Sequence, residues 1–378
     1  MFGDKRGLTV RIGVDAGSAL NGFGGVASYS RQLVNALARH ATGHEIVLFD
    51  LDRGVHRRED FERVLGALPT RVRSAEASSE ELSKLDLFHA PAFVMPPQGA
   101  PHHVFTLHDL TVLSHSECHT LENRIRTMVA VAGALARGAT IISVSRATRS
   151  EAVRLLSLSG ESLEVLSPIL DPRFTPAGND ELDDAALRRS GVEGPYCLVV
   201  GSLEPRKNLG RLLDAWELLP DGVREQHQLV VVASAGWLQG GLRGRLSELE
   251  RTGSVRRLNR VAGLDLAALY RRARAVVFTS LAEGFGLPVA EAMACGAPVV
   301  TSNVSSMPEV AGGAAILVDP EDPDAIANGV FRVLDDSELR RDLRERGPEQ
   351  VLRFSAESVV PRLLEIYRRT IRRSNAST

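Results

Sequence analysis

Two glutamates flank a glycine turn in the C-terminal half of the chain. Glu283 precedes Gly284-Phe285-Gly286, and Glu291 follows shortly after Pro288. An ionised carboxylate only accepts hydrogen bonds, so acids beside a turn suit the recognition of hydroxyl groups. Glycine lets the backbone approach a ligand, and Pro288 is typical of a first helical turn, whose free N–H groups attract phosphate. Phosphate and hydroxyls together describe a nucleotide sugar, although the same pattern is also found in a plain tight connection.

A basic pair, Arg206 and Lys207, provides a second candidate for chemistry. It lies in Gly201-Ser-Leu-Glu-Pro-Arg-Lys-Asn208, between an apolar segment at 196–200 and a helical pattern from Leu209. Guanidinium makes planar two-point contacts with phosphate oxygens, and ammonium adds a compact charge. Taken alone, an adjacent pair of cations is more often a solvated surface than a phosphate site.

Two polar residues in the N-terminal half follow predicted strands. His108 comes directly after a strand at 103–107, and Ser145 precedes a helix at 147–156. Open parallel sheets place their ligands at the carboxyl ends of strands, where such a histidine can reach them. A lone histidine is usually structural, however, and Ser145 also suits the N-cap of its helix.

Gly24 and Gly25 end a glycine-rich loop, 21–25, between a first strand at 10–14 and a helix at 26–39. The loop lacks the G-x-G-x-x-G spacing of a dinucleotide-binding fingerprint, so an NAD-dependent enzyme is poorly supported. A phosphate-binding loop and a plain flexible turn are both compatible with these glycines.

The elements that position these residues alternate between strand and helix. This alternation predicts an α/β fold with parallel sheets covered on both faces. The apolar runs that predict strands lie at 10–14, 45–49, 86–89, 103–107, 139–144, 196–200, 229–233, 261, 275–280, 298–302 and 315–318.

A stiff connection divides the chain into two domains. Residues 167–179 contain Pro168, Pro172 and Pro176 and have no helical period. At 378 residues the chain is comfortable for two α/β domains. We therefore expect an N-terminal domain at 1–172 and a C-terminal domain at 180–354.

Taken together, these motifs resemble the retaining, nucleotide-sugar-dependent glycosyltransferases of family 4. The turn between Glu283 and Glu291 is similar to their E-x7-E signature, and the segment from Gly201 to Asn208 is similar to their diphosphate-binding pattern. The resemblance implies a GT-B fold, with two Rossmann-like domains facing each other across a deep cleft. It also implies that a C-terminal helix, 356–373, crosses back onto the N-terminal, acceptor-binding domain.

The resemblance also implies roles for individual residues. Arg206 and Lys207 would stabilise the leaving diphosphate, and Glu283 and His108 would act at the transferred sugar. Glu291 would accept hydrogen bonds from the ribose of the nucleotide. The remaining donor-binding residues would be Gly24, Gly25, Ser145, Gly201, Gly284, Phe285, Gly286 and Leu287.

The expected reaction moves a hexose from a nucleoside-diphosphate sugar to a hydroxyl of a sugar, lipid-linked or small-molecule acceptor. The segment after His108 is similar to mannosyl- and rhamnosyl-transferring members, which favours a GDP- or dTDP-linked donor, with UDP as the alternative. We expect no cofactor and no metal, because the chain lacks a D-x-D pair in a glycine-rich loop. A non-catalytic sugar-nucleotide-binding protein and a phosphorylase of the same fold remain as alternatives.

Composition excludes several other classes. A net charge of −2 gives no electrostatic case for nucleic-acid binding, and no apolar run approaches a membrane span. Three widely separated cysteines favour a reducing cytoplasm. Arg137, Arg146 and Arg149 could form a basic surface for peripheral contact with the inner membrane face, but scattered arginines are more often a solvated face.

Overall fold

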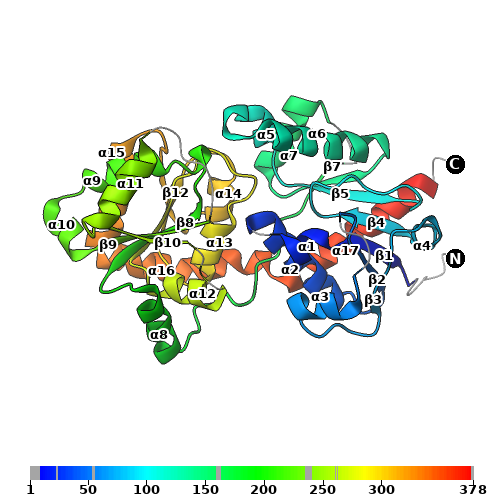
Figure 1. Ribbon diagram of the computed structural model, residues 1–378, viewed down its shortest axis with the longest axis horizontal. Helices are drawn as coiled ribbons and strands as arrows, with labels where there is room; N and C mark the ends of the chain where they lie inside the picture. The colour runs from blue at the N-terminus through cyan, green and yellow to red at the C-terminus, as the bar shows by residue number, and fades with distance from the viewer. Residues whose placement is uncertain are drawn as a thin grey trace. The chain divides into compact units, whose positions relative to one another are not determined.

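The computed structural model describes residues 9–22, 24–52, 56–158, 163–234, 241–259, 261 and 263–375. The chain divides into two compact units (Figure 1). The first unit comprises Met1–Leu170 and Phe354–Thr378, and the second comprises Asp171–Arg353. The sequence placed the division between 172 and 180, whereas in the structure it falls directly before Asp171.

The first unit is built on a parallel sheet in the order β3-β2-β1-β4-β5-β6-β7. Its strands are β1 (Arg11–Asp15), β2 (Glu45–Phe49), β3 (Val72–Ser74), β4 (Leu87–Ala90), β5 (His103–Leu107), β6 (Thr140–Ser143) and β7 (Leu163–Val165). Its helices are α1 (Gly17–Asn21), α2 (Gly24–His40), α3 (Arg58–Leu65), α4 (Ser79–Ser83), α5 (Thr111–Ser114), the 3-10 turn η1 (Ser116–Cys118), α6 (Leu121–Ala136), α7 (Arg146–Leu156) and α17 (Ala356–Asn375).

Alternate residues of the central strands β4 and β5 enter two different layers. Phe88 and Phe105 pack in one hydrophobic cluster with Ala130 and Ala134 of α6. Their neighbours point to the opposite face of the sheet, because successive side chains in a strand alternate. Burial on both faces explains why these strands read as apolar runs in the sequence.

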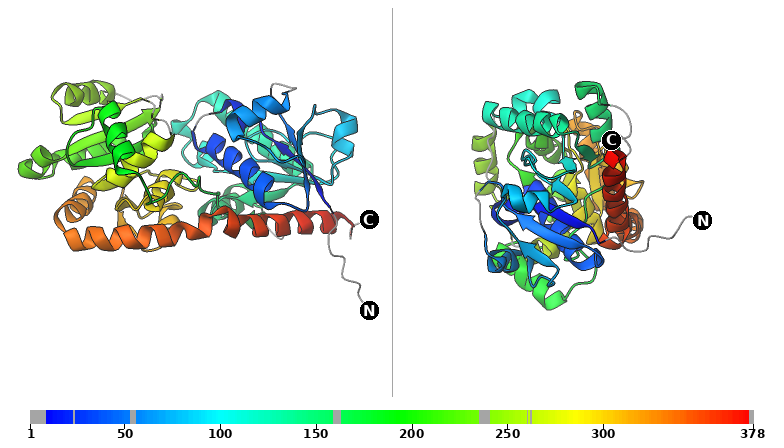
Figure 2. Two further views of the ribbon diagram at one scale, coloured as in Figure 1. Left: turned by 90° about the horizontal axis from the view of Figure 1, so that it is seen from below. Right: turned by 90° about the vertical axis from the view of Figure 1, so that its right-hand side faces the viewer.

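On the opposite face, the C-terminal helix α17 is tied to the sheet by buried hydrogen bonds. His89 Nδ1 and the Tyr367 hydroxyl are 2.6 Å apart, and His89 Nε2 lies 2.8 Å from Thr106 Oγ1. The Tyr29 hydroxyl of α2 lies 3.0 Å from the same Thr106 oxygen. Figure 2 shows α17 running along the first unit, so the end of the chain completes the unit in which the chain began.

The second unit has a parallel sheet in the order β10-β9-β8-β11-β12-β13. Its strands are β8 (Tyr196–Ser202), β9 (Gln228–Ser234), β10 (Val255–Leu258), β11 (Ala275–Phe278), β12 (Val299–Ser302) and β13 (Ile316–Val318). Its helices are α8 (Asp180–Ser190), the 3-10 turn η2 (Pro205–Lys207), α9 (Leu209–Glu217), α10 (Asp221–Gln226), α11 (Leu242–Arg251), α12 (Gly263–Arg272), α13 (Leu287–Ala294), α14 (Met307–Ala311), α15 (Pro323–Asp335) and α16 (Ser337–Val351); the turn η3 (Leu352–Phe354) follows.

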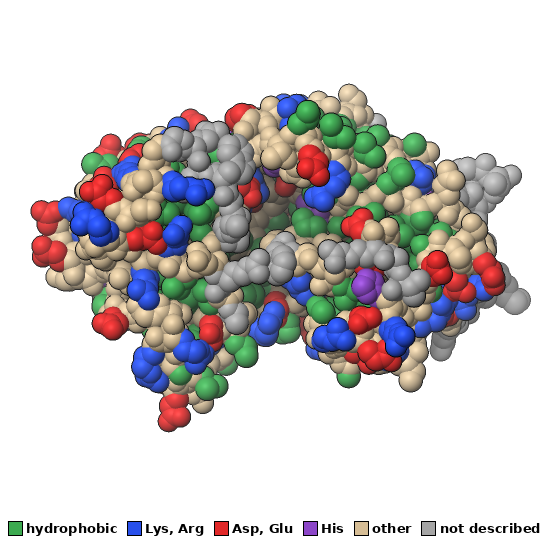
Figure 3. Space-filling view, in the orientation of Figure 1, with side chains coloured by type: hydrophobic (Ala, Val, Ile, Leu, Met, Phe, Trp, Pro, Cys, Tyr) green, Lys and Arg blue, Asp and Glu red, His purple; other side chains and the backbone are tan. Residues whose placement is uncertain are grey.

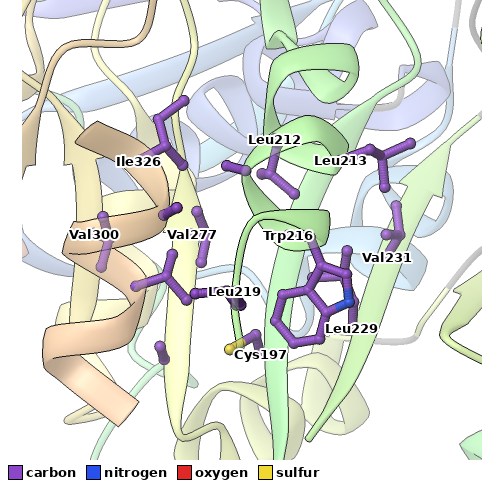
Figure 4. Close-up of a cluster of buried hydrophobic side chains, with 14 of the residues drawn as sticks. Cys197, Leu212, Leu213, Trp216, Leu219, Leu229, Val231, Val277, Val300 and Ile326 are labelled. Carbon is purple, nitrogen blue, oxygen red and sulfur yellow. The ribbon is translucent and has the colours of Figure 1, made fainter. Parts of the chain in front are cut away.

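The core of the second unit lies between the sheet and helices α9 and α15. Trp216 is 4% exposed and packs in the cluster that contains Cys197 and Leu229 (Figure 4). Ile326 of α15 joins the same cluster beside Val300. This core fixes α9, and therefore the turn that precedes it, against the ends of the strands.

Two local predictions are wrong. The strand predicted at Val261 lies instead at Val255–Leu258, at the edge of the sheet, where Arg256 is exposed. The loop predicted at 21–25 is shorter, because α1 ends at Asn21 and α2 begins at Gly24. Gly24 has a φ of +79°, which allows the chain to turn directly into the helix. Phe23, which the same prediction included, lies outside the described residues.

Candidate functional site

The candidate site of the second unit lies where the strand order of its sheet reverses. From β8 the chain proceeds outward through β9 and β10 and then returns to β11 on the other side of β8. In open α/β sheets, ligands bind outside the carboxyl ends of the strands at such a point. The two loops that leave this point carry the residues that the sequence singled out, Gly201–Lys207 after β8 and Glu283–Leu287 after β11.

Arg206 and Lys207 both meet Glu283. Arg206 Nη1 lies 2.8 Å from Glu283 Oε2, and Lys207 Nζ donates to Oε1. The Ser280 hydroxyl also donates to Oε1, at 2.8 Å. The three charged side chains are 10–15% exposed. The sequence-based expectation for the basic pair alone was a free cationic surface or a phosphate site, and the structure adds a carboxylate that holds both cations in place.

The environment of Glu283 favours its charged form. Burial by itself raises the pKa of this carboxyl, but the charges of Arg206 and Lys207, with hydrogen bonds from Lys207 and Ser280, outweigh burial and lower the pKa to about 2. Glu283 is therefore ionised at neutral pH. Arg206 Nε also lies 3.2 Å from Glu204 Oε2, so the two cations of the cluster are paired with two carboxylates.

The base of the site is formed by glycine and the stem of Lys207. Gly201 faces the aliphatic carbons of Lys207. A Cβ added at Gly201 would lie 3.8 Å from Cγ and Cδ of Lys207. The Lys207 ammonium lies 5.2 Å from the centre of the Phe278 ring, in cation–π contact. A small open hollow lies beside these residues and is lined also by Thr279.

The turn between Glu283 and α13 is held by two serines that the sequence analysis did not assign to the site. Ser305 Oγ accepts from the Glu283 N–H at 3.0 Å, and Ser306 Oγ donates to the Phe285 carbonyl at 2.9 Å. Gly286 has a φ of +95°, and a Cβ there would lie 2.6 Å from Met307 Cε. Only glycine fits this position. The serines come from the next loop along the sheet, so no local pattern could have revealed them.

Glu291 lies on α13 in a different environment from Glu283. The Tyr270 hydroxyl donates to Glu291 Oε2 at 3.2 Å. Burial raises the pKa of Glu291 to about 7; the nearby Asp171 charge adds to the rise, while Tyr270 and Arg173 oppose it. The two glutamates of one motif thus have pKa values displaced in opposite directions. Such a divergence between neighbouring acids is typical of functional sites.

In the first unit, His108 is buried among aromatic rings. Its Nε2 lies 2.7 Å from the Pro91 carbonyl oxygen, which can only accept, so Nε2 carries the proton. Tyr29 and Phe93 contact the ring edge-to-face at centroid distances of 4.8 and 5.5 Å. Burial lowers the pKa of His108. The ring is therefore neutral, with Nδ1 as its acceptor nitrogen.

Ser145 is the N-cap of helix α7, which is one of the two roles that its position in the sequence suggested. Its hydroxyl accepts from the Thr148 N–H at 3.0 Å at the start of α7. Thr148 Oγ1 in turn donates to the His108 carbonyl at 3.3 Å, which connects this cap to the loop after β5. The structure thus brings the loops that carry His108 and Ser145 together at the carboxyl ends of β5 and β6.

Asp15, at the carboxyl end of β1, is a buried acid without full hydrogen bonding. Its Oδ1 accepts from the Leu51 N–H at 3.1 Å, whereas Oδ2 is buried without a hydrogen-bond partner among the described residues. Burial raises the pKa of Asp15 to about 7, and the charges of Asp50 and Asp52 add to the rise. β1 and β4 flank the reversal point of this sheet, so Asp15 lies at the kind of position where open α/β sheets bind ligands.

Among the described residues, no group of three or more histidine, cysteine or acidic side chains is arranged to hold a metal ion. Over the same part of the chain, no helix has the length and apolar character needed to cross a membrane.

Comparisons with known proteins place the chain in a family. Residues 185–350 match the family described as "Glycosyl transferases group 1". The chain is 34% identical over 283 residues to the O-antigen chain mannosyltransferase B of Escherichia coli, covering 75% of this chain and 74% of that protein. The chain therefore belongs to the group 1 glycosyltransferases, and it is an enzyme of that class.

Two solved structures confirm the fold. Sucrose-phosphate synthase from Thermosynechococcus elongatus superposes with a TM-score of 0.70 at 22% identity, covering 95% of this chain and 98% of that one. Anabaena Alr3699/HepE, solved in complex with UDP and glucose, gives 0.69 at 18% identity, covering 94% and 98%. The predicted fold class, two Rossmann-like α/β domains of the GT-B type, is confirmed.

Proposed function

We propose that this protein is a retaining, family 4 hexosyltransferase that transfers mannose from a nucleoside-diphosphate sugar to an acceptor hydroxyl. The observation that carries the proposal is the cluster of Arg206, Lys207 and Glu283 at the reversal point of the second sheet. The similarity to a protein named as a mannosyltransferase supports mannose as the sugar. We propose a GDP-linked sugar as the preferred donor, with dTDP- and UDP-linked sugars as the alternatives.

In the proposed reaction, the bond between the anomeric carbon and the diphosphate oxygen breaks while the acceptor oxygen bonds to the same carbon. The acceptor's proton passes to the leaving diphosphate. Arg206 and Lys207 stabilise the negative charge that grows on the diphosphate, and this stabilisation increases toward the transition state. We propose that these cations make a metal ion unnecessary.

The two glutamates have separate roles in this proposal. Glu283, ionised and held by two cations, accepts hydrogen bonds from hydroxyls of the transferred sugar. Glu291 receives the ribose hydroxyls, whose hydrogen bonds favour its charged form and lower its pKa. Backbone groups of the turn, Gly284, Phe285, Gly286 and Leu287, complete the donor site together with Gly201.

The first unit supplies the remaining contacts. His108 presents Nδ1 as an acceptor for a substrate hydroxyl, while Nε2–H stays on the Pro91 carbonyl. By resemblance, Gly24 and Gly25 contribute backbone contacts to the donor, and Ser145 holds the loop that carries His108. The acceptor is a sugar, a lipid-linked sugar or a small molecule, and we place the reaction in the cytoplasm, at or near the inner membrane face.

The test is a donor screen with three readouts. The purified protein is incubated with GDP-, dTDP- and UDP-linked hexoses, with and without sugar acceptors, and released nucleoside diphosphate is measured. Transfer with retained anomeric configuration, read by NMR of the product, supports the proposal. An inverted product contradicts retention, and tight donor binding without any nucleotide release would identify a non-catalytic sugar-nucleotide-binding protein.

A further inference from the structure

Four buried polar side chains of the first unit form one chain of hydrogen bonds. The Tyr367 hydroxyl of α17 lies 2.6 Å from His89 Nδ1 on β4. His89 Nε2 and the Tyr29 hydroxyl of α2 lie 2.8 and 3.0 Å from Thr106 Oγ1 on β5. Each of these side chains is at most 4% exposed, unlike the outer surface, where Figure 3 shows acidic and basic side chains interspersed on the face in view. The chain thus joins the last helix to α2 through the two central strands.

The bonds of this chain all run in the same direction. Burial lowers the pKa of His89 to about 3, so the ring is neutral and carries a single N–H. If Nε2 donates to Thr106, then Nδ1 accepts from Tyr367, and the Thr106 hydroxyl donates to the oxygen of Tyr29. If Nδ1 carries the proton instead, all three bonds reverse. The loss of one hydroxyl therefore changes the hydrogen bonding of every other member of the chain.

Tyr29 connects this chain to His108. Its ring contacts the His108 ring edge-to-face, at a centroid distance of 4.8 Å and an interplanar angle of 89°. Phe93 contacts the same imidazole, and the Pro91 carbonyl holds its Nε2. The carbonyl fixes one atom of the imidazole, whereas rotation about that hydrogen bond is restrained by the rings that pack against it. The direction of His108 Nδ1 therefore depends on where the Tyr29 ring is held.

We propose that Tyr29 and Tyr367 are positioning residues for His108. The hydrogen-bond chain holds the Tyr29 ring against the imidazole, and this contact keeps Nδ1 in the orientation in which it accepts from a substrate hydroxyl. Tyr367 acts at a distance, through His89 and Thr106. The inference rests on the proposed function, in which His108 Nδ1 accepts that hydrogen bond. It gives the C-terminal helix a role in turnover in addition to its place in the core.

The kinetic test uses tyrosine-to-phenylalanine substitutions, each of which removes one buried hydroxyl and keeps the ring. Tyr29→Phe and Tyr367→Phe should each lower kcat for sugar transfer by about tenfold, because a small displacement of a positioned group slows the reaction. The Michaelis constant for the donor should stay within about twofold of wild type, because the second unit makes the phosphate and ribose contacts in the proposed function.

Tyr196 provides the matched control. It is 1% exposed, and its hydroxyl donates to the Leu269 carbonyl at 2.7 Å in the second unit. Tyr196→Phe also removes one buried hydroxyl, so it should lower the free energy of unfolding as the other two substitutions do, but it should keep the wild-type kcat.

A double-mutant cycle separates positioning from a general loss of stability. If Tyr29 acts through His108, Tyr29→Phe should lower kcat in the wild-type background and have no further effect in His108→Ala. Equal effects in the two backgrounds would overturn the inference and leave the proposed role of His108 in place. Wild-type turnover of His108→Ala would overturn both, because His108 would then have no role for Tyr29 to support.

Nitrogen NMR of protein with ¹⁵N-labelled histidine gives a readout that requires no turnover. The His108 signal, assigned by its loss in His108→Ala, should show a protonated Nε2 and an unprotonated Nδ1 in the wild type. The Nδ1 resonance should be displaced and broadened in Tyr367→Phe, although the removed hydroxyl belongs to α17, and it should be unchanged in Tyr196→Phe. An identical His108 spectrum in the wild type and in Tyr367→Phe would overturn the inference, whichever reaction the enzyme catalyses.

Discussion

The ammonium group of Lys207 and the carboxylate of Glu283 form an ion pair between two loops that are 76 positions apart in the sequence. This pair joins the two loops that leave the second sheet where its strand order reverses. The folded state lowers the pKa of Glu283 below its ordinary 4.5 to about 2. The stability that the pair contributes is therefore complete above pH 4.5 and is lost as the pH falls toward 2.

Replacing Lys207 should affect both turnover and stability. Lys207→Ala should lower kcat by about 10²–10³, the scale for losing one group that stabilises transition-state charge. It should also lower the free energy of unfolding by about 1–3 kcal/mol, because Glu283 loses one of its buried partners. An effect on stability is expected because the Lys207 side chain is only 15% exposed.

Lys84 offers a matched control for this substitution. It is 40% exposed and also pairs with glutamates, Glu80 and Glu81, on the surface of the first unit. Lys84→Ala should leave both kcat and the free energy of unfolding close to those of the wild type. Steady-state kinetics and urea unfolding of both variants provide the comparison, and turnover of Lys207→Ala within about twofold of wild type would contradict the phosphate role.

Substitutions of Glu283 and Glu291 should have different effects on nucleotide binding and on turnover. Glu291→Gln should weaken binding of the sugar-free nucleoside diphosphate by about 1–3 kcal/mol, because ribose contacts are present with and without the sugar. Glu283→Gln should lower kcat with little change in that affinity, because its contacts sharpen as positive charge develops on the sugar. Calorimetric titration with the nucleoside diphosphate measures the difference. Equal weakening by both substitutions would show that the assignment of the sugar to Glu283 is wrong.

Asp15 should make the free protein less stable as the pH rises. Its pKa is raised from an ordinary 3.8 to about 7 in the folded state. Below pH 3.8 both states are protonated; between 3.8 and 7 only the unfolded state ionises, so the free energy of unfolding falls, by up to about 4 kcal/mol. Asp15→Asn should remove this pH dependence. Thermal unfolding at pH 4.5 and pH 8 measures it, and an equal effect of the substitution at both pH values would contradict the prediction.

Chelation of metals should not reduce activity. We propose that Arg206 and Lys207 neutralise the leaving diphosphate, so transfer should proceed at the same rate in EDTA as in buffer with added Mg²⁺ or Mn²⁺. The assay is donor turnover after dialysis against the chelator. Activity that disappears in EDTA and returns with one divalent metal would assign the diphosphate to a metal ion instead.

Local signals were sufficient for the elements that carry the site. The apolar segments predicted as strands at 196–200 and 275–280 form β8 (Tyr196–Ser202) and β11 (Ala275–Phe278), and Pro288 stands in the first turn of α13. These features are local, since propensity, glycine and proline act on neighbouring residues. The strand predicted at Val261 is wrong because Val255–Leu258, with its two arginines, is an edge strand, whose exposure removes the apolar signal.

The contacts inside the site could not be predicted, because they join residues far apart in the sequence. Tyr270 and Glu291 lie on two different helices, and Ser305 and Ser306 reach the turn from another loop. Lys207 likewise meets Glu283 and Phe278, which are also distant from it in the sequence. Residue types suggested which side chains do chemistry, but their pairing follows from the strand order of the sheet.

The hydrogen bond between His89 and Tyr367 spans 278 of the 378 positions of the chain. A growing polypeptide emerging from the ribosome therefore contains the seven strands of the first sheet long before it contains the helix that covers them. The second unit, by contrast, is one continuous segment and has all its own residues once Arg353 has been added. The half of the protein that is synthesised first is thus the half whose core is finished last, and a chain that stops before α17 lacks the side chain that satisfies His89.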